Sequence, residues 1–209
     1  MLIVLAAGAL VALTVALDHR GHRRASLAAK VGASSCFMAV ALLSPRPDPA
    51  WATWILAGLA LGMVGDVCLA LPGRRAFLAG LVAFLLGHVG YVGAFSGAAV
   101  AWGHPSQLAP VAASAAALAW LWPHAGAMRG AVVAYVVVIT AMVVAALAAA
   151  PGLPPATARA VVAGSLLFYA SDLFVARHRF VAPGLVNRAV GLPLYYAGQL
   201  LIAWSVALQ

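Results

Sequence analysis

The chain has 209 residues, of which 66% are hydrophobic and only 8% are charged. Soluble domains contain about 45–50% apolar and about 25% charged residues, so this composition predicts an integral membrane protein. The net charge of +8 does not indicate nucleic-acid binding, because the basic residues stand in short clusters between apolar runs. The two cysteines, Cys36 and Cys68, fall in different runs and form neither a disulfide framework nor a metal-binding motif.

Eight apolar runs are candidates for membrane-spanning helices, each of which needs about 20 mostly apolar residues. Short segments rich in Pro, Gly and Arg separate them, and none is long enough for a soluble domain. We therefore predict an all-α fold: a polytopic membrane helix bundle, with one eight-helix transmembrane domain over residues 1–209. The runs are Met1–Leu17, Leu27–Leu43, Trp51–Leu71, Ala76–Phe95, Ser106–Trp122, Ala131–Ala149, Ala156–Ala176 and Ala189–Leu208.

The arginines predict the orientation of this bundle. Nine of them stand in or beside the odd-numbered loops, whereas only Arg46 and Arg159 stand on the other side. Cytoplasmic loops carry an excess of basic residues, so we expect the odd-numbered loops in the cytoplasm and both termini outside. The first run has no basic segment before it, which favours a retained helix over a secretory signal. The Ala- and Arg-rich composition is typical of a GC-rich bacterium, so we place the protein in a bacterial cytoplasmic membrane.

Polar side chains inside the apolar runs are the candidate functional residues. An aspartate at the centre of a membrane helix costs about 2.5–3.5 kcal/mol on insertion scales, and such residues usually face the bundle interior and mark function. Asp18 and Asp48 are instead expected in loops, exposed to solvent. The polar residues within the runs are Lys30, Asp66, His88, Asp172, Tyr91, Ser171, Tyr195, Tyr196 and Gln199.

Four of these residues are expected at similar depth in the cytoplasmic half. Asp66 stands eight residues before Arg74, or about 12 Å along a helix, and Asp172 stands about 7.5 Å before Arg177. Lys30 and Tyr195 lie at comparable distances from their own basic loops. This agreement predicts one polar pocket built from four helices. Structural alternatives remain: the aspartates could make interhelical hydrogen bonds or pair with Lys30, Lys30 could snorkel to the surface, and His88 could be a core histidine.

Four motifs carry a resemblance to a known family. They are GDVCLAL (65–71), FLAGLVAFLLGHVGYVGAF (77–95), AGSLLFYASDLFVA (163–176) and PLYYAGQLLIAW (193–204). Together they resemble the YhhN family, which includes the TMEM86-type lysoplasmalogenases. Lys30 fits the lysine of that family, although Val31 stands where the family usually has proline. The resemblance implies an enzyme that hydrolyses the vinyl ether bond of a lysoplasmalogen, a lysophospholipid taken from the bilayer, into a fatty aldehyde and a glycerophospho-base.

The chemistry of that reaction accounts for buried carboxyl groups. A vinyl ether opens when a proton reaches its distal alkene carbon, and water then attacks the oxocarbenium ion. A carboxyl removed from water keeps its proton more readily, and a second carboxylate can stabilise the cation and orient water. We therefore expect Asp66 and Asp172 to be catalytic, with either as the acid, and His88 to relay protons. We expect no cofactor, and we expect substrate contacts from Lys30, Tyr91, Ser171, Arg188, Tyr195, Tyr196 and Gln199.

Two other functions would also place polar groups in a membrane. A proton-coupled transporter of small molecules or lipids would use buried Asp, His and Lys, but its polar residues should connect both faces. A metal-dependent, ceramidase-like hydrolase would need several ligands, typically histidines, and only His88 lies within a predicted helix. We therefore expect no metal site.

Overall fold

The computed structural model describes all 209 residues and contains only helices and short turns, which confirms the all-α prediction. Eight α-helices lie within one or two turns of the predicted runs. They are α1 (Leu2–His19), α2 (Arg23–Leu43), α3 (Pro49–Ala70), α4 (Arg74–Gly97), α5 (Leu108–Ala125), α6 (Arg129–Ala149), α7 (Pro155–Ala176) and α8 (Leu185–Trp204).

Two helices begin one turn before their apolar runs, because hydropathy marks only the part of a helix that lies in the apolar layer. α2 begins at Arg23 and α8 at Leu185. The prediction that Asp18 lies in a loop is wrong, since it stands in the last turn of α1 and pairs with Arg188 of α8. Asp48 is exposed and caps α3: its Oδ1 accepts the backbone N–H groups of Ala50 and Trp51 at 2.9 and 3.0 Å.

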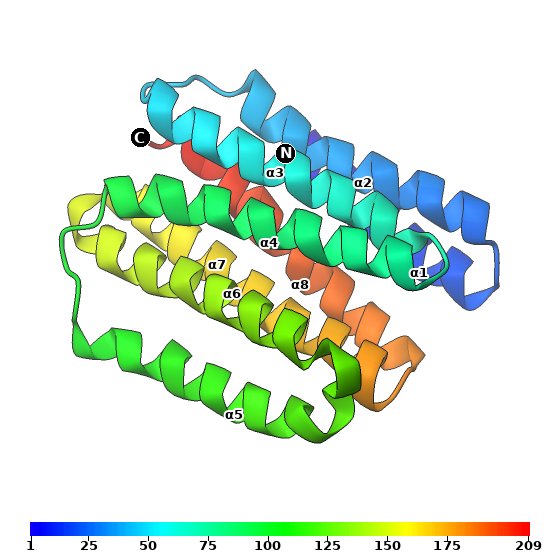
Figure 1. The fold of residues 1–209 in the computed structure, drawn as a ribbon. Coiled ribbons are helices and arrows are strands. Elements are labelled where there is room, and N and C mark those ends of the chain that lie inside the picture. The colour runs from blue at the N-terminus through cyan, green and yellow to red at the C-terminus, as the bar shows by residue number, and fades with distance from the viewer.

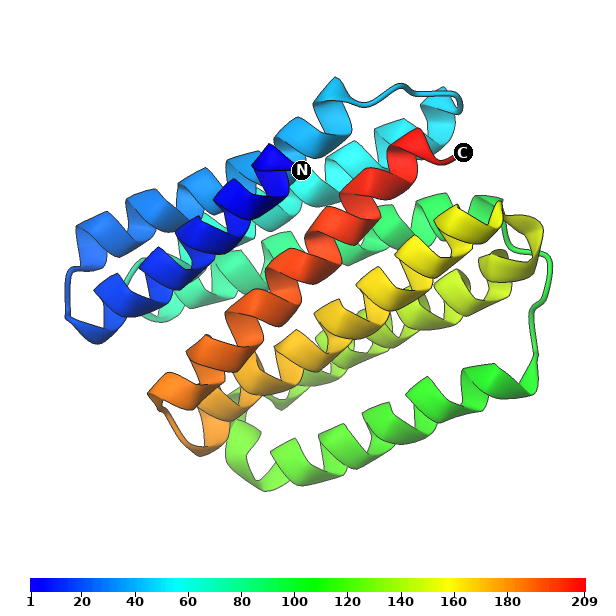
Figure 2. The same cartoon turned by 180° about the vertical axis from the view of Figure 1, so that it is seen from behind.

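The helices form a bundle in which α8 joins the two halves of the chain. Helices α1 to α4 pack in sequence, α4 packs on α6, and α6 packs on α7. α8 packs on α7 and returns to α1, α2 and α3, whereas α5 lies at the edge of the bundle, mainly against α6 (Figures 1 and 2). This connectivity brings residues from both ends of the chain to the same interior.

The loops that follow α1, α3, α5 and α7 lie together at one end of the bundle, and the carboxyl terminus lies at the other (Figure 1). The arginine clusters of the sequence therefore gather at one end, called here the arginine end. Seven continuous helical stretches are long and apolar enough to cross a membrane, and one of them, Pro105–Gly152, contains both α5 and α6. The chain is an integral membrane protein.

Glycines set the close approach of α7 and α8. A Cβ atom added at Gly198 would lie 2.8 Å from the carbonyl oxygen of Gly164, and one added at Gly164 would lie 2.9 Å from the carbonyl oxygen of Gly198. Small residues let membrane helices pack backbone against backbone. This contact fixes the position of α8, which carries three of the polar residues predicted for the site, at Tyr195, Tyr196 and Gln199.

We predict that Gly198→Ala destabilises the protein by about 2 kcal/mol, because a methyl group there meets backbone atoms that cannot rotate away and must separate the two helices. Gly8→Ala is the matched control, since Gly8 lies in α1 with nothing within 4 Å of an added Cβ. Unfolding measured in detergent should show a loss only for Gly198→Ala. Equal stability of the two variants would contradict the close packing.

Candidate active site

A cavity of about 670 Å³ is lined from the loop residues Gly21 and Gly73, at the arginine end, to Ile139 and Tyr195 near the middle of their helices. Its inner wall carries Asp66 of α3 and Asp172 of α7, together with the side chains of Lys30 and Tyr195. Its lining is otherwise mainly apolar, and it draws residues from all eight helices. The cavity therefore brings the buried Asp66 and the half-buried Asp172 to one space.

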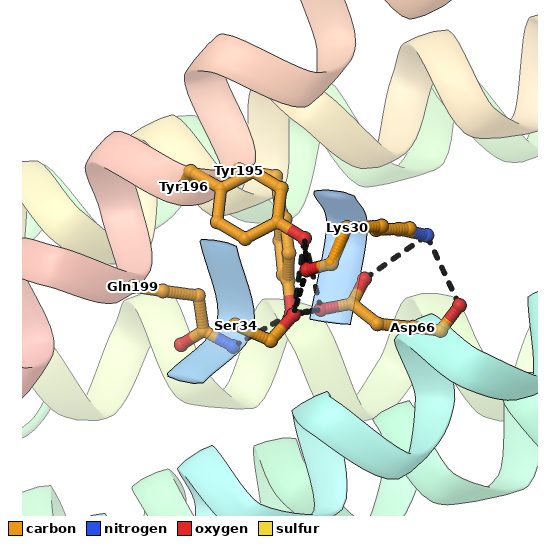
Figure 3. A network of polar contacts seen from close by, with 6 residues as sticks. All are labelled: Lys30, Ser34, Asp66, Tyr195, Tyr196 and Gln199. Atoms are coloured by element: carbon orange, nitrogen blue, oxygen red, sulfur yellow. Dashed lines mark hydrogen bonds and ion pairs between the residues drawn. The ribbon is translucent and has the colours of Figure 1, made fainter. Parts of the chain in front are cut away.

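Asp66 is held by donors from two other helices (Figure 3). The Nζ of Lys30 lies 3.1 Å from Oδ1, and it also donates to the backbone carbonyl of Asp66 at 3.2 Å. The hydroxyls of Ser34 and Tyr195 donate to Oδ2 at 2.6 and 2.8 Å. The Asp66 side chain is only 2% exposed and that of Lys30 12%. The ammonium and two hydroxyls together compensate a carboxylate that has lost its water.

A second layer of hydrogen bonds holds these donors in place (Figure 3). The Tyr196 hydroxyl donates to the carbonyl oxygen of Lys30 at 3.1 Å and lies 3.0 Å from the Ser34 hydroxyl. The Gln199 amide donates to the Tyr195 hydroxyl at 3.3 Å, and the Tyr91 hydroxyl donates to Gln199 Oε1 at 2.7 Å. A chain of hydrogen bonds thus runs from α4 through α8 to Asp66.

Asp172 has a much simpler environment. Its Oδ2 accepts one hydrogen bond, from the Tyr135 hydroxyl of α6 at 2.7 Å, and its Oδ1 accepts none from the protein. No cation lies within ion-pair distance of it. The two acids therefore belong to separate polar networks on the wall of the same cavity.

His88 lies behind the cavity wall and does not line it. Its Nδ1 lies 2.6 Å from the carbonyl oxygen of Phe84, so Nδ1 carries the proton and Nε2 is an acceptor, buried without a partner. Its ring packs edge-on against Phe168 and Tyr135, with centroids 4.5 and 5.4 Å away. His88 thus contacts the tyrosine that donates to Asp172.

The predicted site residues fall into two groups. Those that line the cavity are Lys30, Asp66, Ser171, Asp172, Arg188 and Tyr195. Those that are buried behind its wall are His88, Tyr91, Tyr196 and Gln199.

The YhhN family model matches residues 25–206, which is most of the chain and includes every one of these residues. The chain belongs to the YhhN family. A protein named lysoplasmalogenase from Mycobacterium bovis is 36% identical over 152 residues, covering 69% of this chain and 55% of that protein. Lysoplasmalogenase TMEM86A from Bos taurus and from Homo sapiens is 34% identical over 158 and 161 residues, covering 74% of this chain and 65% of each relative. The matched region thus spans between about half and two thirds of these relatives, and no solved structure shows significant similarity.

The sequence reasoning overlooked two residues that contact the acids of this YhhN-family chain. Ser34 follows Lys30 by one helical turn, so the pair shares a face of α2, and this spacing could have identified it. Tyr135 is the one tyrosine of the apolar run Ala131–Ala149, where a hydroxyl needs a partner. The structure contains no group of three or more His, Cys, Asp or Glu side chains that could hold a metal ion.

We predict that Lys30→Met destabilises the protein by about 3 kcal/mol, because it leaves the Asp66 carboxylate buried without its cation. The double variant Lys30→Met/Asp66→Asn should be more stable than Lys30→Met, since it removes both charges. Arg159→Met, which removes an exposed cation, should change stability by no more than about 0.5 kcal/mol. Unfolding in detergent checks this, and additive effects of the two site substitutions would show that the ion pair does not form.

Proposed function

We propose that this chain hydrolyses the vinyl ether bond of a lysoplasmalogen, giving a fatty aldehyde and a glycerophospho-base. Its membership of the YhhN family and its similarity to proteins named lysoplasmalogenase support this activity. The observation that carries the proposal is the exposure of two carboxyl groups, Asp66 and Asp172, to one cavity in an otherwise apolar bundle. A vinyl ether needs an acid and an anion, and these are the acids that the cavity offers deep in the bundle.

The proposed reaction begins with proton transfer to carbon. A carboxylic acid donates its proton to the alkene carbon farther from the ether oxygen, and the adjacent carbon becomes an oxocarbenium ion. Water adds to that ion and loses a proton to a carboxylate, which leaves a hemiacetal. The hemiacetal breaks its bond to the glycerol oxygen, which takes a proton, and aldehyde is released. The sum is addition of one water across one ether bond, with no redox step.

The unequal surroundings of the two aspartates support different roles. Asp66 receives an ammonium and two hydroxyl donors, an arrangement suited to a fixed anion that stabilises the oxocarbenium ion and orients water. Asp172 receives one hydroxyl donor and has an unoccupied Oδ1 that can carry a proton. We therefore assign Asp172 as the general acid and Asp66 as the stabilising carboxylate.

The remaining residues would act through these two. Tyr135 orients Asp172, and His88 packs against the Tyr135 ring, so we assign His88 to positioning. Tyr91, Tyr196 and Gln199 would keep Tyr195 and Lys30 on Asp66, while Ser171 lines the cavity beside Asp172. The single hydrocarbon tail would lie against the apolar wall formed by Ala117, Leu121, Val132, Val136 and Ile139 of α5 and α6.

Neither alternative function is favoured. A transporter needs a polar route between both ends of the bundle, whereas the cavity is lined from the arginine end only as far as Ala117, Ile139 and Tyr195, near the middle of their helices. A metal-dependent hydrolase needs a cluster of ligands that the side chains do not form.

The proposed orientation places the arginine end in the cytoplasm. Eight crossings, one for each α-helix, and a bacterial cytoplasmic membrane fit the arginine asymmetry and the turn at Gly126, which reverses the chain between α5 and α6. Both termini would then lie outside, and the cavity would open to the cytoplasm.

This orientation predicts cysteine accessibility in a Cys36→Ser/Cys68→Ala background. Arg20→Cys and Arg75→Cys, at the arginine end, should resist a membrane-impermeant maleimide in intact cells, and His104→Cys, between α4 and α5, should react. All three should react after the cells are opened. The reverse pattern in intact cells would overturn the orientation.

For the mechanism, we predict that Asp66→Asn and Asp172→Asn each reduce release of fatty aldehyde from a vinyl-ether lysolipid by at least about 100-fold, the lower end for general acid–base catalysis. The double variant should be little worse than either single variant, because the two carboxyls act in one step. Turnover is measured by mass spectrometry on detergent-purified protein.

The control for these variants is Asp48→Asn, which removes an acid outside the cavity and should keep wild-type turnover. Thermal unfolding of each variant separates loss of chemistry from loss of fold. If folded Asp172→Asn turns over within a few-fold of wild type, it is not the acid.

A further inference from the structure

The mouth of the cavity carries an ion pair between the first and the last helix. The Arg188 guanidinium, in the first turn of α8, donates through Nη1 to Oδ2 of Asp18, in the last turn of α1. Both residues line the cavity, and their side chains are 42% and 25% exposed. Ion pairs with this exposure contribute little stability, so the pair does little to hold α1 against α8.

Both members of the ion pair keep hydrogen-bonding groups that no protein atom uses. A guanidinium has five N–H donors, and Arg188 uses only Nη1 toward the protein. The Oδ1 of Asp18 accepts no hydrogen bond from any side chain or backbone group. Arg188 can therefore hold Asp18 and still bind an anion, and Asp18 can still accept from a cation.

The surrounding charges favour an anion beside Arg188. Arg23 and Arg179 line the same mouth, and Arg179 is held over the Phe77 ring at 4.3 Å. Asp18 is the one carboxylate of the mouth, so the mouth combines three guanidinium groups with a single negative site. Guanidinium groups match phosphate oxygens by paired hydrogen bonds.

The spacing along α8 is comparable with the separation between the tail ether and the phosphate of a lysophospholipid, once the reach of the Arg188 side chain is included. Arg188 precedes Tyr195, the donor to Asp66, by seven residues, or about 10 Å along the helix. In a lysophospholipid, the glycerol carbons separate the tail ether from the phosphate, and the amine lies beyond the phosphate. A substrate whose vinyl ether reaches Asp66 therefore extends its phosphate toward Arg188.

We propose that the Asp18–Arg188 pair is the head-group selector of the cavity: Arg188 binds the substrate phosphate, and Asp18 orients Arg188 and accepts the cationic amine carried by that phosphate. This inference rests on the proposed function, because it assumes a lysophospholipid substrate. It goes beyond that function by assigning recognition of the phosphate to Arg188 and recognition of the amine to Asp18.

Binding of alkyl-ether lysolipids, which lack the vinyl bond, tests the selector without requiring turnover. Three ligands with the same tail differ in the head: phosphate with a cationic amine, phosphate alone, and free glycerol. Wild type should bind them with decreasing affinity in that order. Asp18→Asn should weaken binding of the amine ligand about tenfold, while the affinity for the phosphate-only ligand stays the same or increases. Arg188→Gln should weaken binding of both phosphate-containing ligands by at least about tenfold and leave the affinity for the glycerol ligand unchanged.

Arg20→Gln is the matched control, because Arg20 is exposed at the same end of the bundle and does not line the cavity; it should bind all three ligands as wild type does. Equal weakening for all three ligands in Asp18→Asn or Arg188→Gln would mean that the pair is only structural and would overturn the proposal, as would no change in either variant. Cleavage of the vinyl-ether lysolipids that carry the same head groups is measured separately. If the variants change ligand affinities as predicted but the vinyl-ether lysolipids are not cleaved, the proposed function is wrong and the head-group proposal is supported.

Discussion

The ion pair between Lys30 and Asp66 is the interaction on which the architecture of the site depends. A carboxylate inside an apolar bundle needs a cation and hydrogen-bond donors, since the apolar side chains around it cannot solvate its charge. Its donors come from α2 and α8, whereas Asp66 itself stands on α3. The contacts that compensate the Asp66 charge therefore fix the relative positions of α2, α3 and α8. They also place the carboxylate on the wall of the cavity.

The two acids differ because their surroundings differ, not because of their residue type. Asp66 has one ammonium and two hydroxyl donors, while Asp172 has a single tyrosine hydroxyl. Under the proposed mechanism, this asymmetry would leave Asp66 as the anion and Asp172 as the proton donor on one wall, which is what the opening of a vinyl ether requires. The membrane supplies the apolar surroundings that a soluble enzyme would have to build, and the arginine end supplies charge where the polar head of a lipid would lie.

The sequence predicted where the helices lie and which polar residues face the interior, but not how these residues are paired. Hydropathy located all eight helices, and distance from the basic loops placed Lys30, Asp66 and Tyr195 at one depth, where the structure brings them into contact. Position along the helices does not determine which helices are neighbours in the bundle. The hydrogen bond between Asp172 and Tyr135 was therefore not predicted. Asp18 was misplaced because a charge next to a histidine and arginines is typical of a loop, whereas the helix continues to His19.

Cleavage of three lysolipids that differ only in the tail linkage tests the central claim most directly. Purified protein receives the vinyl-ether, alkyl-ether and acyl forms with the same head group and chain, and the products are weighed by mass spectrometry. Proton transfer to an alkene carbon predicts fatty aldehyde from the vinyl ether alone. The alkyl ether has no alkene to protonate, and the chain has no Gly-x-Ser-x-Gly nucleophile motif for the acyl ester. Fatty acid released from the acyl form at a comparable rate, or an intact vinyl ether, would contradict the account.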